Sequence, residues 1–160
     1  MANNITMLAK DAVSAKMAQC FLTVNGNRYN FMNAKNVELK LTKNKAKVAI
    51  LGKPLSGHKT TGMEGTGTAT FYYNTSIFRR AMLEFKKTGE DFYFTMQITN
   101  EDPSSAAGRQ TIQVFNCNLD DMILAKFDAE SEDPLDEEVN FTFDDWEMPE
   151  SFTLLDGMEA

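Results

Sequence analysis

The sequence contains few of the residue types that build catalytic and metal centres. Among its 160 residues are one histidine and two cysteines, which excludes a histidine-rich metal centre and a disulfide framework. Cys20 and Cys117 form no CxxC motif, and we expect both to be small apolar residues of strands. No hydrophobic run approaches the roughly 18 residues of a membrane-spanning helix, and the first residues lack the pattern of a signal peptide. We therefore expect a protein made in the cytoplasm that needs no cofactor.

Length and composition are those of a small globular protein. The chain has a mass of 18.0 kDa, with 42% hydrophobic, 11% aromatic and 24% charged residues. This balance is typical of a folded protein and not of a disordered one. A chain of this size builds one sizeable core, which excludes most multi-domain enzyme architectures.

Charge is unevenly distributed along the chain. Residues 1–118 carry 15 Lys and Arg against 8 Asp and Glu, whereas residues 119–160 carry 1 against 15. A basic part joined to an acidic part permits head-to-tail contacts between copies, although a solvated acidic edge strand is the simpler interpretation. The isoelectric point near 4.7 argues against sequence-specific nucleic-acid binding, which needs a cationic surface.

Hydrophobic alternation and turn residues predict a mainly β chain. Asn25-Gly26 between two strand-like runs indicates a hairpin, and the alternation that starts at Val37 slips near Asn44, where we expect a bulge or turn. Strands are predicted over 19–24, 28–32, 37–51, 66–73, 91–99, 109–118, 120–127 and 136–146. Because no βα rhythm is present, we predict an antiparallel sandwich or barrel with one packed helix.

Glycine and proline mark the predicted loops. Five of the nine glycines lie within residues 52–67 together with Pro54, which predicts a loop longer than most connections in compact domains. A helix is predicted over residues 75–88 and ends before Gly89. We expect all four prolines, including Pro149, to lie outside the strands. The predicted β domain covers residues 19–150, between an N-terminal arm (1–18) and a C-terminal tail (151–160).

Two segments imitate functional motifs without satisfying them. The stretch GKPLSGHKT at 52–60 is similar to a phosphate-binding loop, but His58 separates Gly57 from Lys59 and puts the motif out of register. The acidic segment 128–138 lacks the glycine of a calcium-binding loop, and Pro134 interrupts the required spacing. We therefore expect neither a catalytic residue nor a metal site. Exposed strand edges, loose arms and segregated charge fit a subunit of a ring or tube better than an enzyme.

Several stretches together resemble the tail tube proteins of PBSX-like contractile prophages, related phages and R-type bacteriocins. They are VAILG at 48–52, GHKTTG at 57–62, GTGTATFY at 65–72, KTGEDFYFT at 87–95 and FTFDDWEMPE at 141–150. The resemblance covers roughly residues 20–150, and its glycine-rich part is the most specific. It leaves open whether the particle is an infectious phage, a defective prophage or a bacteriocin.

The resemblance implies a non-catalytic structural subunit. Six copies would form a ring, each copy lending strands to an inter-subunit barrel, and the rings would stack helically into the hollow inner tube of a contractile tail. The implied partners are further copies of the chain, the sheath protein, the baseplate, the tail terminator and the tape measure protein. A membrane would be only the target of the assembled particle, whose tube is built in the bacterial cytoplasm.

Two groups of residues are candidates for contacts between subunits. The glycine-rich loop is long enough to reach a neighbouring ring, and acidic residues near the C-terminus are expected to meet lysines across a subunit boundary. The inter-ring candidates are Gly52, Gly57, His58, Lys59, Thr60, Gly62 and Glu64. The candidate charge pairs join Lys43, Lys45 and Lys47 to Asp136, Glu137, Glu138, Asp144 and Asp145.

Three alternatives remain at this point. A secretion-system tube ring has a similar fold, although the GHKTTG stretch favours the prophage family. A monomeric ligand-binding β-barrel would need an interior pocket and blunted edges. An enzyme would need a constellation of reactive residues that the sequence does not offer.

Overall fold

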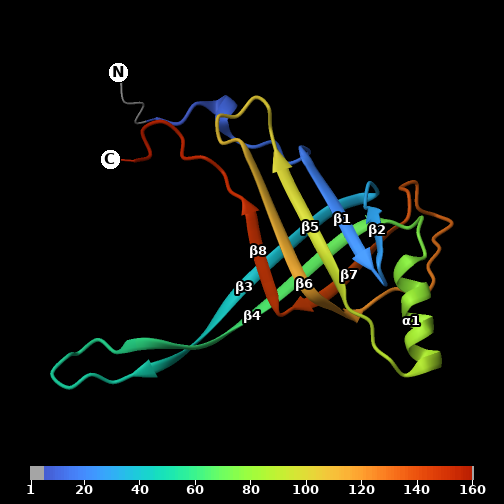
Figure 1. Ribbon diagram of the computed structural model, residues 1–160, viewed down its shortest axis with the longest axis horizontal. Coiled ribbons are helices and arrows are strands. Elements are labelled where there is room, and N and C mark those ends of the chain that lie inside the picture. Colours follow the sequence, from blue (N-terminus) through green and yellow to red (C-terminus); the bar gives the residue numbers. More distant parts are fainter. Residues whose placement is uncertain (1–5, 160) are drawn as a thin grey trace. The chain divides into compact units, whose positions relative to one another are not determined.

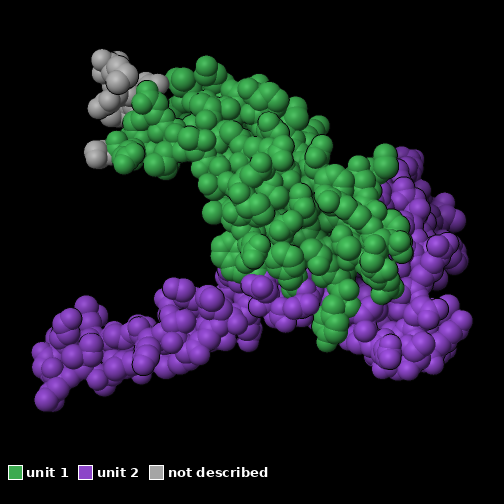
Figure 2. Space-filling view, in the orientation of Figure 1, with its two compact units in different colours: residues 1–32, 93–115, 146–160 green, residues 33–92, 116–145 purple. Residues whose placement is uncertain are grey.

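The computed structural model describes residues 6–159 and divides the chain into two compact units (Figures 1 and 2). Within the described part, unit 1 comprises residues 6–32, 93–115 and 146–159, and unit 2 comprises 33–92 and 116–145. The elements are η1 (Ala9–Asp11), β1 (Ala18–Val24), β2 (Asn27–Asn30), β3 (Ala34–Val48), β4 (Gly57–Tyr72), α1 (Ile77–Thr88), β5 (Phe94–Glu101), β6 (Arg109–Asp121), β7 (Asp136–Phe143) and β8 (Asp145–Glu150).

Unit 1 is an antiparallel sheet with the strand order β2–β1–β5–β6, and β8 also pairs with β6. The predicted hairpin between β1 and β2 is confirmed, since Asn25 and Gly26 adopt φ angles of 51° and 80°, the left-handed conformation that such two-residue turns require. The core of this unit contains Leu22, Phe94 and Met96, all nearly inaccessible to solvent. Phe94 and Met96 are alternate residues of β5, so their side chains lie on the same face of the sheet.

Both chain ends of unit 1 are tied to the loop between β5 and β6. The Ala106 N–H donates to Asp11 Oδ1 (3.1 Å), and the Ser105 hydroxyl donates to the Asp11 carbonyl (2.7 Å). From the other end, the Thr153 N–H donates to the Ala107 carbonyl (2.7 Å). The predicted N-terminal arm contains η1, and its first five residues lie outside the described part. The C-terminal tail begins directly after β8.

Unit 2 is built from the end of β6 and from β7, β4 and β3, in that order, with α1 as its helix. Phe78 of α1 packs against Phe71 of β4 with their ring centres 6.0 Å apart. The helix ends at Gly89, whose φ of 77° and N–H bond to the Phe85 carbonyl form a left-handed cap. The predicted helix is therefore confirmed. Among the described residues, no helix is long and apolar enough to cross a membrane.

Two glycines of β4 allow aromatic rings of β7 to lie directly on its backbone. Gly65 pairs with Phe143, and Gly67 pairs with Phe141. A Cβ atom at either glycine would overlap the facing ring. Glycine is therefore required here because it has no side chain.

The predicted loop over residues 52–67 is wrong for most of its length. The structure has only a short connection over 49–56, because β4 begins at Gly57. The glycines that suggested a loop occupy strand positions, where Gly65 and Gly67 accommodate rings and Gly57 and Gly62 pair with β3. The predicted irregularity near Asn44 is confirmed, since the register between β3 and β4 shifts between Asn44 and Lys45.

The last predicted strands have different boundaries. β6 runs without interruption to Asp121, and residues 122–135 form no strand, so the strand predicted over 120–127 is wrong. The one predicted over 136–146 is divided into β7 and β8. Pro149 lies within β8, against expectation, and this is compatible with a strand whose one partner in the described sheet is β6.

Both cysteines are buried strand residues, as predicted. Cys20 of β1 and Cys117 of β6 are both buried inside their units. Burial raises the pKa of the Cys20 thiol to about 12, because removal from water disfavours the thiolate. This thiol is therefore protonated and unreactive at neutral pH.

Candidate assembly surface

The outer part of the β3–β4 hairpin extends beyond the strands that support its base (Figure 1). β4 pairs with β7 only over Gly65–Tyr72, whereas β3 and β4 remain paired with each other as far as Val48 and Gly57. We call residues 42–64 the hairpin arm. Its seven paired residues on β3 correspond to a ribbon about 23 Å long. Such a two-stranded ribbon gains little stability in water by itself, which makes the hairpin arm a candidate surface for a partner.

One face of the hairpin arm carries a row of three lysines. Every second residue of β3 from Val37 to Leu41 is apolar, so Val37, Leu39 and Leu41 lie on one face of the strand. Val37 and Leu39 are half-buried in unit 2. The same alternation continues as Lys43, Lys45 and Lys47, because the extra residue at the register shift, Thr61, lies on β4. The face that is apolar at the base of the hairpin thus becomes cationic in the hairpin arm.

The tip of the hairpin arm presents leucine side chains to solvent. Lys53 N–H donates to the Ile50 carbonyl (3.1 Å) across a tight turn in which Gly52 has a φ of 81°. Leu51 is fully exposed and Leu55 is 83% exposed. Exposed leucines at the end of a projecting ribbon suit burial against another surface.

All seven inter-ring candidates lie on the hairpin arm. Gly52 belongs to the turn, and the other six are residues of β4. His58, Thr60 and Met63 face Lys47, Lys45 and Lys43 across the ribbon. The structure therefore brings together the candidates that the sequence assigned to a loop, but on a paired strand.

The acidic candidates divide into residues paired within the chain and residues without a described ion pair. Asp136 bonds Lys35 (2.8 Å), and Lys126 lies 3.5 Å away. The hydrogen bond from Lys35 lowers the pKa of Asp136, and the same bond raises the pKa of Lys35. Among residues 6–159, no ion pair joins Lys43, Lys45 or Lys47 to an acidic group of the chain. Glu138 likewise forms no ion pair within residues 6–159, and Asp144 accepts a hydrogen bond from Asn116 Nδ2 (2.9 Å).

Glu137 is not available to a neighbouring subunit. Its side chain is 3% exposed, and both of its oxygens accept from Arg79, at 2.7 and 3.2 Å. Arg79 also donates to the carbonyls of Ile123 (3.1 Å) and Thr75. Its guanidinium lies 4.5 Å from the ring centre of Tyr73. The prediction for Glu137 is therefore corrected, because a buried carboxylate with these partners holds its own unit together.

Sequence reasoning missed the Arg79–Glu137 pair although a signal was present. Glu137 occupies the same alternating positions of β7 as Val139, Phe141 and Phe143, all of which are buried. A charged residue in an inward position predicts a buried partner of opposite charge. That partner comes from α1, and nothing in the local sequence specifies it.

The other face of the unit 2 sheet is polar. Thr66, Thr68 and Thr70 of β4 pair with Thr142, Asn140 and Glu138 of β7, and Thr68 donates to Asn140 across the strands (3.0 Å). Glu38 and Lys40 of β3 continue these rows. Hydroxyl, amide and carboxylate groups therefore cover this sheet face.

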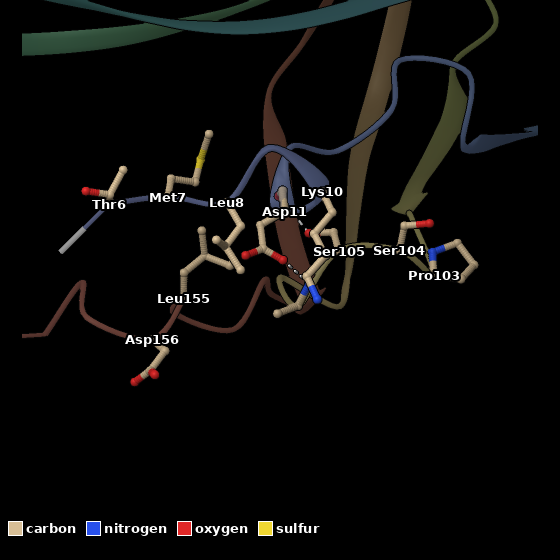
Figure 3. A pocket seen from close by; sticks show the side chains of 11 residues that line it. Thr6, Met7, Leu8, Lys10, Asp11, Pro103, Ser104, Ser105, Leu155 and Asp156 are labelled. Atoms are coloured by element: carbon tan, nitrogen blue, oxygen red, sulfur yellow. Dashed lines mark hydrogen bonds between the residues drawn. The ribbon is translucent and has the colours of Figure 1, made fainter. Parts of the chain in front are cut away.

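Unit 1 contains a pocket of about 430 Å³ between its two chain ends and the loop before β6 (Figure 3). Residues from all three segments surround it, and both apolar and charged side chains are among them. They are Thr6, Met7, Leu8, Lys10, Asp11, Pro103, Ser104, Ser105, Ala106, Leu155 and Asp156.

Comparisons with known proteins identify the family. The family described as "Phage tail tube protein" matches residues 5–150. Two proteins of Bacillus subtilis strain 168 are similar over nearly their whole lengths. The phage-like element PBSX protein XkdM is 39% identical and covers 93% of this chain and 98% of its own. The uncharacterized protein YqbM is 40% identical and covers 91% and 96%.

The fold also matches a solved structure. A chain in the baseplate of the anti-feeding prophage aligns with a TM-score of 0.67, covering 86% of this chain and 95% of that one at 12% identity. The likeness shows a shared fold, in agreement with the predicted tail-tube-like β architecture. The resemblance found in the sequence is thereby confirmed, and the chain belongs to the phage tail tube protein family, whose members are structural and not enzymatic.

Proposed function

We propose that six copies of this chain form a ring, and that the rings stack helically into the inner tube of a contractile tail or of a phage-tail-like bacteriocin. The observation that carries the proposal is the hairpin arm, an exposed ribbon without support from its own chain. The family supports assembly into a tube. Six-fold symmetry is supported by the matching anti-feeding prophage baseplate, which is described as 6-fold symmetrised.

Unpaired strand edges support a barrel shared between subunits. β3 is the last strand of the unit 2 order, and β2 is the last strand of the unit 1 order. An open edge is a template for pairing with another chain, and closure into a barrel removes it. Hydrogen bonds that run around the ring would make the tube stiff, as envelope penetration requires.

The polar sheet face of unit 2 is the face that we assign to the lumen. Threonine, asparagine and carboxylate groups offer no apolar surface to which DNA could adhere. With a net charge of -7 per chain, six copies would carry -42. This charge would repel phosphate and allow DNA or ions to pass without binding.

Charge pairs across the subunit boundary are a second part of the proposal. The row of Lys43, Lys45 and Lys47 would meet Glu138, Asp144 and Asp145 of a neighbouring copy. Asp136 would keep its bonds to Lys35 and Lys126. The hairpin arm as a whole would reach the next ring. The sheath, the baseplate, the tail terminator and the tape measure protein remain the proposed further partners of the assembled tube.

Negative-stain electron microscopy of the purified chain over a concentration series tests the proposal, with size-exclusion chromatography beside it. We expect rings or hollow tubes, either spontaneously or after addition of a lysate that contains baseplates. A chain that stays monomeric at every concentration and in the presence of baseplates would contradict ring formation. It would also reopen the interpretation as a monomeric ligand-binding barrel. The match to the phage tail tube family favours a tail tube subunit over a secretion-system tube ring.

A further inference from the structure

We propose that the pocket of unit 1 receives the leucine tip of the hairpin arm from a second copy of this chain. The inference rests on the proposed tube, and it names the surface that the hairpin arm binds there. Leu51 and Leu55 would enter the pocket between the two chain ends and the loop before β6 (Figure 3).

The tip has the form of an apolar plug. Ile50 folds back against Gly57, where a Cβ atom would lie 3.2 Å from the Ile50 Cδ1 atom, so it supports the turn. Leu51 and Leu55 are left exposed in solvent. The tight turn fixes the backbone that carries Leu51, so that little backbone entropy is lost when the tip binds a partner.

The lining of the pocket has an apolar part beside its polar residues, and its frame is fixed by hydrogen bonds. Met7, Leu8 and Leu155 contribute apolar side chains from the two chain ends, and Met7 and Leu8 are exposed. The bonds from Ser105 and Ala106 to Asp11 hold the N-terminal segment to the loop. Its volume of about 430 Å³ accommodates large side chains, since small-molecule pockets begin at about 300 Å³.

Charge favours the hairpin arm as the occupant. The hairpin arm carries five lysines and one glutamate, and Lys53 lies in its tip between the two leucines. The pocket is lined by Asp11 and Asp156 together with Lys10, and residues 144–159 carry six acidic residues and no basic one. Opposite charges steer the two surfaces together, while apolar burial supplies the affinity.

Disulfide trapping between two tagged variants tests the contact. Leu51→Cys and Leu155→Cys are placed in separate chains with different affinity tags, mixed, assembled and mildly oxidised. We expect a cross-linked product of twice the 18.0 kDa chain mass that carries both tags. Met32→Cys replaces Leu155→Cys in the control, since Met32 is 87% exposed and lies outside the pocket. The trapped fraction should exceed this control at least tenfold.

The outcomes separate this inference from the proposed function. Tubes in the microscope without selective trapping of Leu51→Cys by Leu155→Cys would overturn the docking site and leave the tube intact. Failure of the wild-type chain to assemble would overturn the tube and the docking site with it. Selective trapping in assembled tubes supports both.

A charge exchange provides a second test without cysteines. We expect Lys53→Asp and Asp156→Lys each to reduce the number of tubes at low salt. The double variant should restore the wild-type number, because the opposite charges face each other again. A double variant as impaired as the single ones would overturn the pairing of these two residues.

Discussion

The base and the arm of the β3–β4 hairpin have the same backbone but opposite surroundings. At the base, β4 is paired on both sides, and Phe141 and Phe143 lie on Gly67 and Gly65. In the hairpin arm the same two strands pair only with each other, and nearly every residue is exposed. The base is therefore stabilised by contacts within its own chain, whereas the surface of the hairpin arm is exposed and available for contacts with another chain.

In the proposed tube, one strand serves the fold along its base and assembly along its arm. Along a single face of β3, Val37, Leu39 and Leu41 are followed by Lys43, Lys45 and Lys47. The backbone period does not change, so strand formation continues while the side chains switch from apolar to charged. Substitutions at the base should consequently act on stability, and substitutions in the hairpin arm should act on assembly.

The largest effect on stability is expected from the ion pair beside the base. Arg79→Met leaves the Glu137 carboxylate buried without its partner, which costs about 3–5 kcal/mol. Arg80→Met is the matched control, because Arg80 is exposed on the same helix and should change stability by no more than about 0.5 kcal/mol. Urea unfolding followed by circular dichroism measures both. Equal stabilities of the two variants would contradict the structural role of Arg79.

Alanine substitutions at two glycines of β4 allow the stability of the base and of the hairpin arm to be compared directly. Gly67→Ala drives a methyl group into the Phe141 ring, and we expect a loss of about 1–3 kcal/mol. Gly62→Ala in the hairpin arm meets its nearest atom, Asn44 Nδ2, at 3.9 Å and should be tolerated or slightly stabilising. Thermal unfolding of both variants measures the difference. A Gly67→Ala variant as stable as Gly62→Ala would show that the ring contact is not needed.

Reversal of the lysine row should impair assembly and leave the fold intact. In the variant Lys45→Glu, Lys47→Glu we expect fewer tubes at low salt, because like charges would then meet at the subunit boundary. Added salt should reduce the defect by screening. Lys86→Glu, Lys87→Glu on α1 is the control for a change of net charge. Undiminished tubes of the first variant, counted by electron microscopy, would argue against charge pairing by these lysines.

The smallest effect concerns an exposed carboxylate with partners in its own chain. Glu150 of β8 accepts from Thr111 (2.8 Å) and Arg109 (2.6 Å), and these bonds lower its pKa. Its contribution to stability is therefore present above the ordinary value of about 4.3 and is lost as the pH falls through the lowered pKa. We expect Glu150→Gln to weaken the acid dependence of unfolding slightly. An unchanged dependence would show that the pair does not stabilise the fold.

The sequence was sufficient for the architecture because alternation and turn chemistry are local properties. The Asn25-Gly26 hairpin, the helix ending at Gly89 and the alternation of β5 follow from short patterns. The loop predicted over 52–67 was wrong because glycine occurs both in loops and in strands where a distant aromatic ring packs on the backbone. The sequence alone does not distinguish the two cases. Only the pairing of β4 with β7 reveals which reason applies.

The candidate surface was predictable as a segment but not in its geometry. The composition of residues 52–64 singled out a segment that the structure places on the hairpin arm, and the charge segregation singled out the lysines. The Arg79–Glu137 pair and the pocket around Asp11 join residues that are distant in sequence. Such contacts depend on tertiary packing, which no local pattern specifies.

A symmetric shortening of the hairpin arm tests the central claim most directly. Removing residues 46–59 and joining Lys45 to Thr60 through Asn-Gly preserves the remaining register and supplies a favoured two-residue turn. Deletion of residues 54–63 would be a poorer test, because it removes residues of β4 and leaves their partners on β3 unpaired. Wild-type and shortened chains are compared by chemical unfolding and by electron microscopy. We predict an unchanged unfolding free energy and rings that do not stack into tubes, whereas tubes of normal length from the shortened chain would contradict the account.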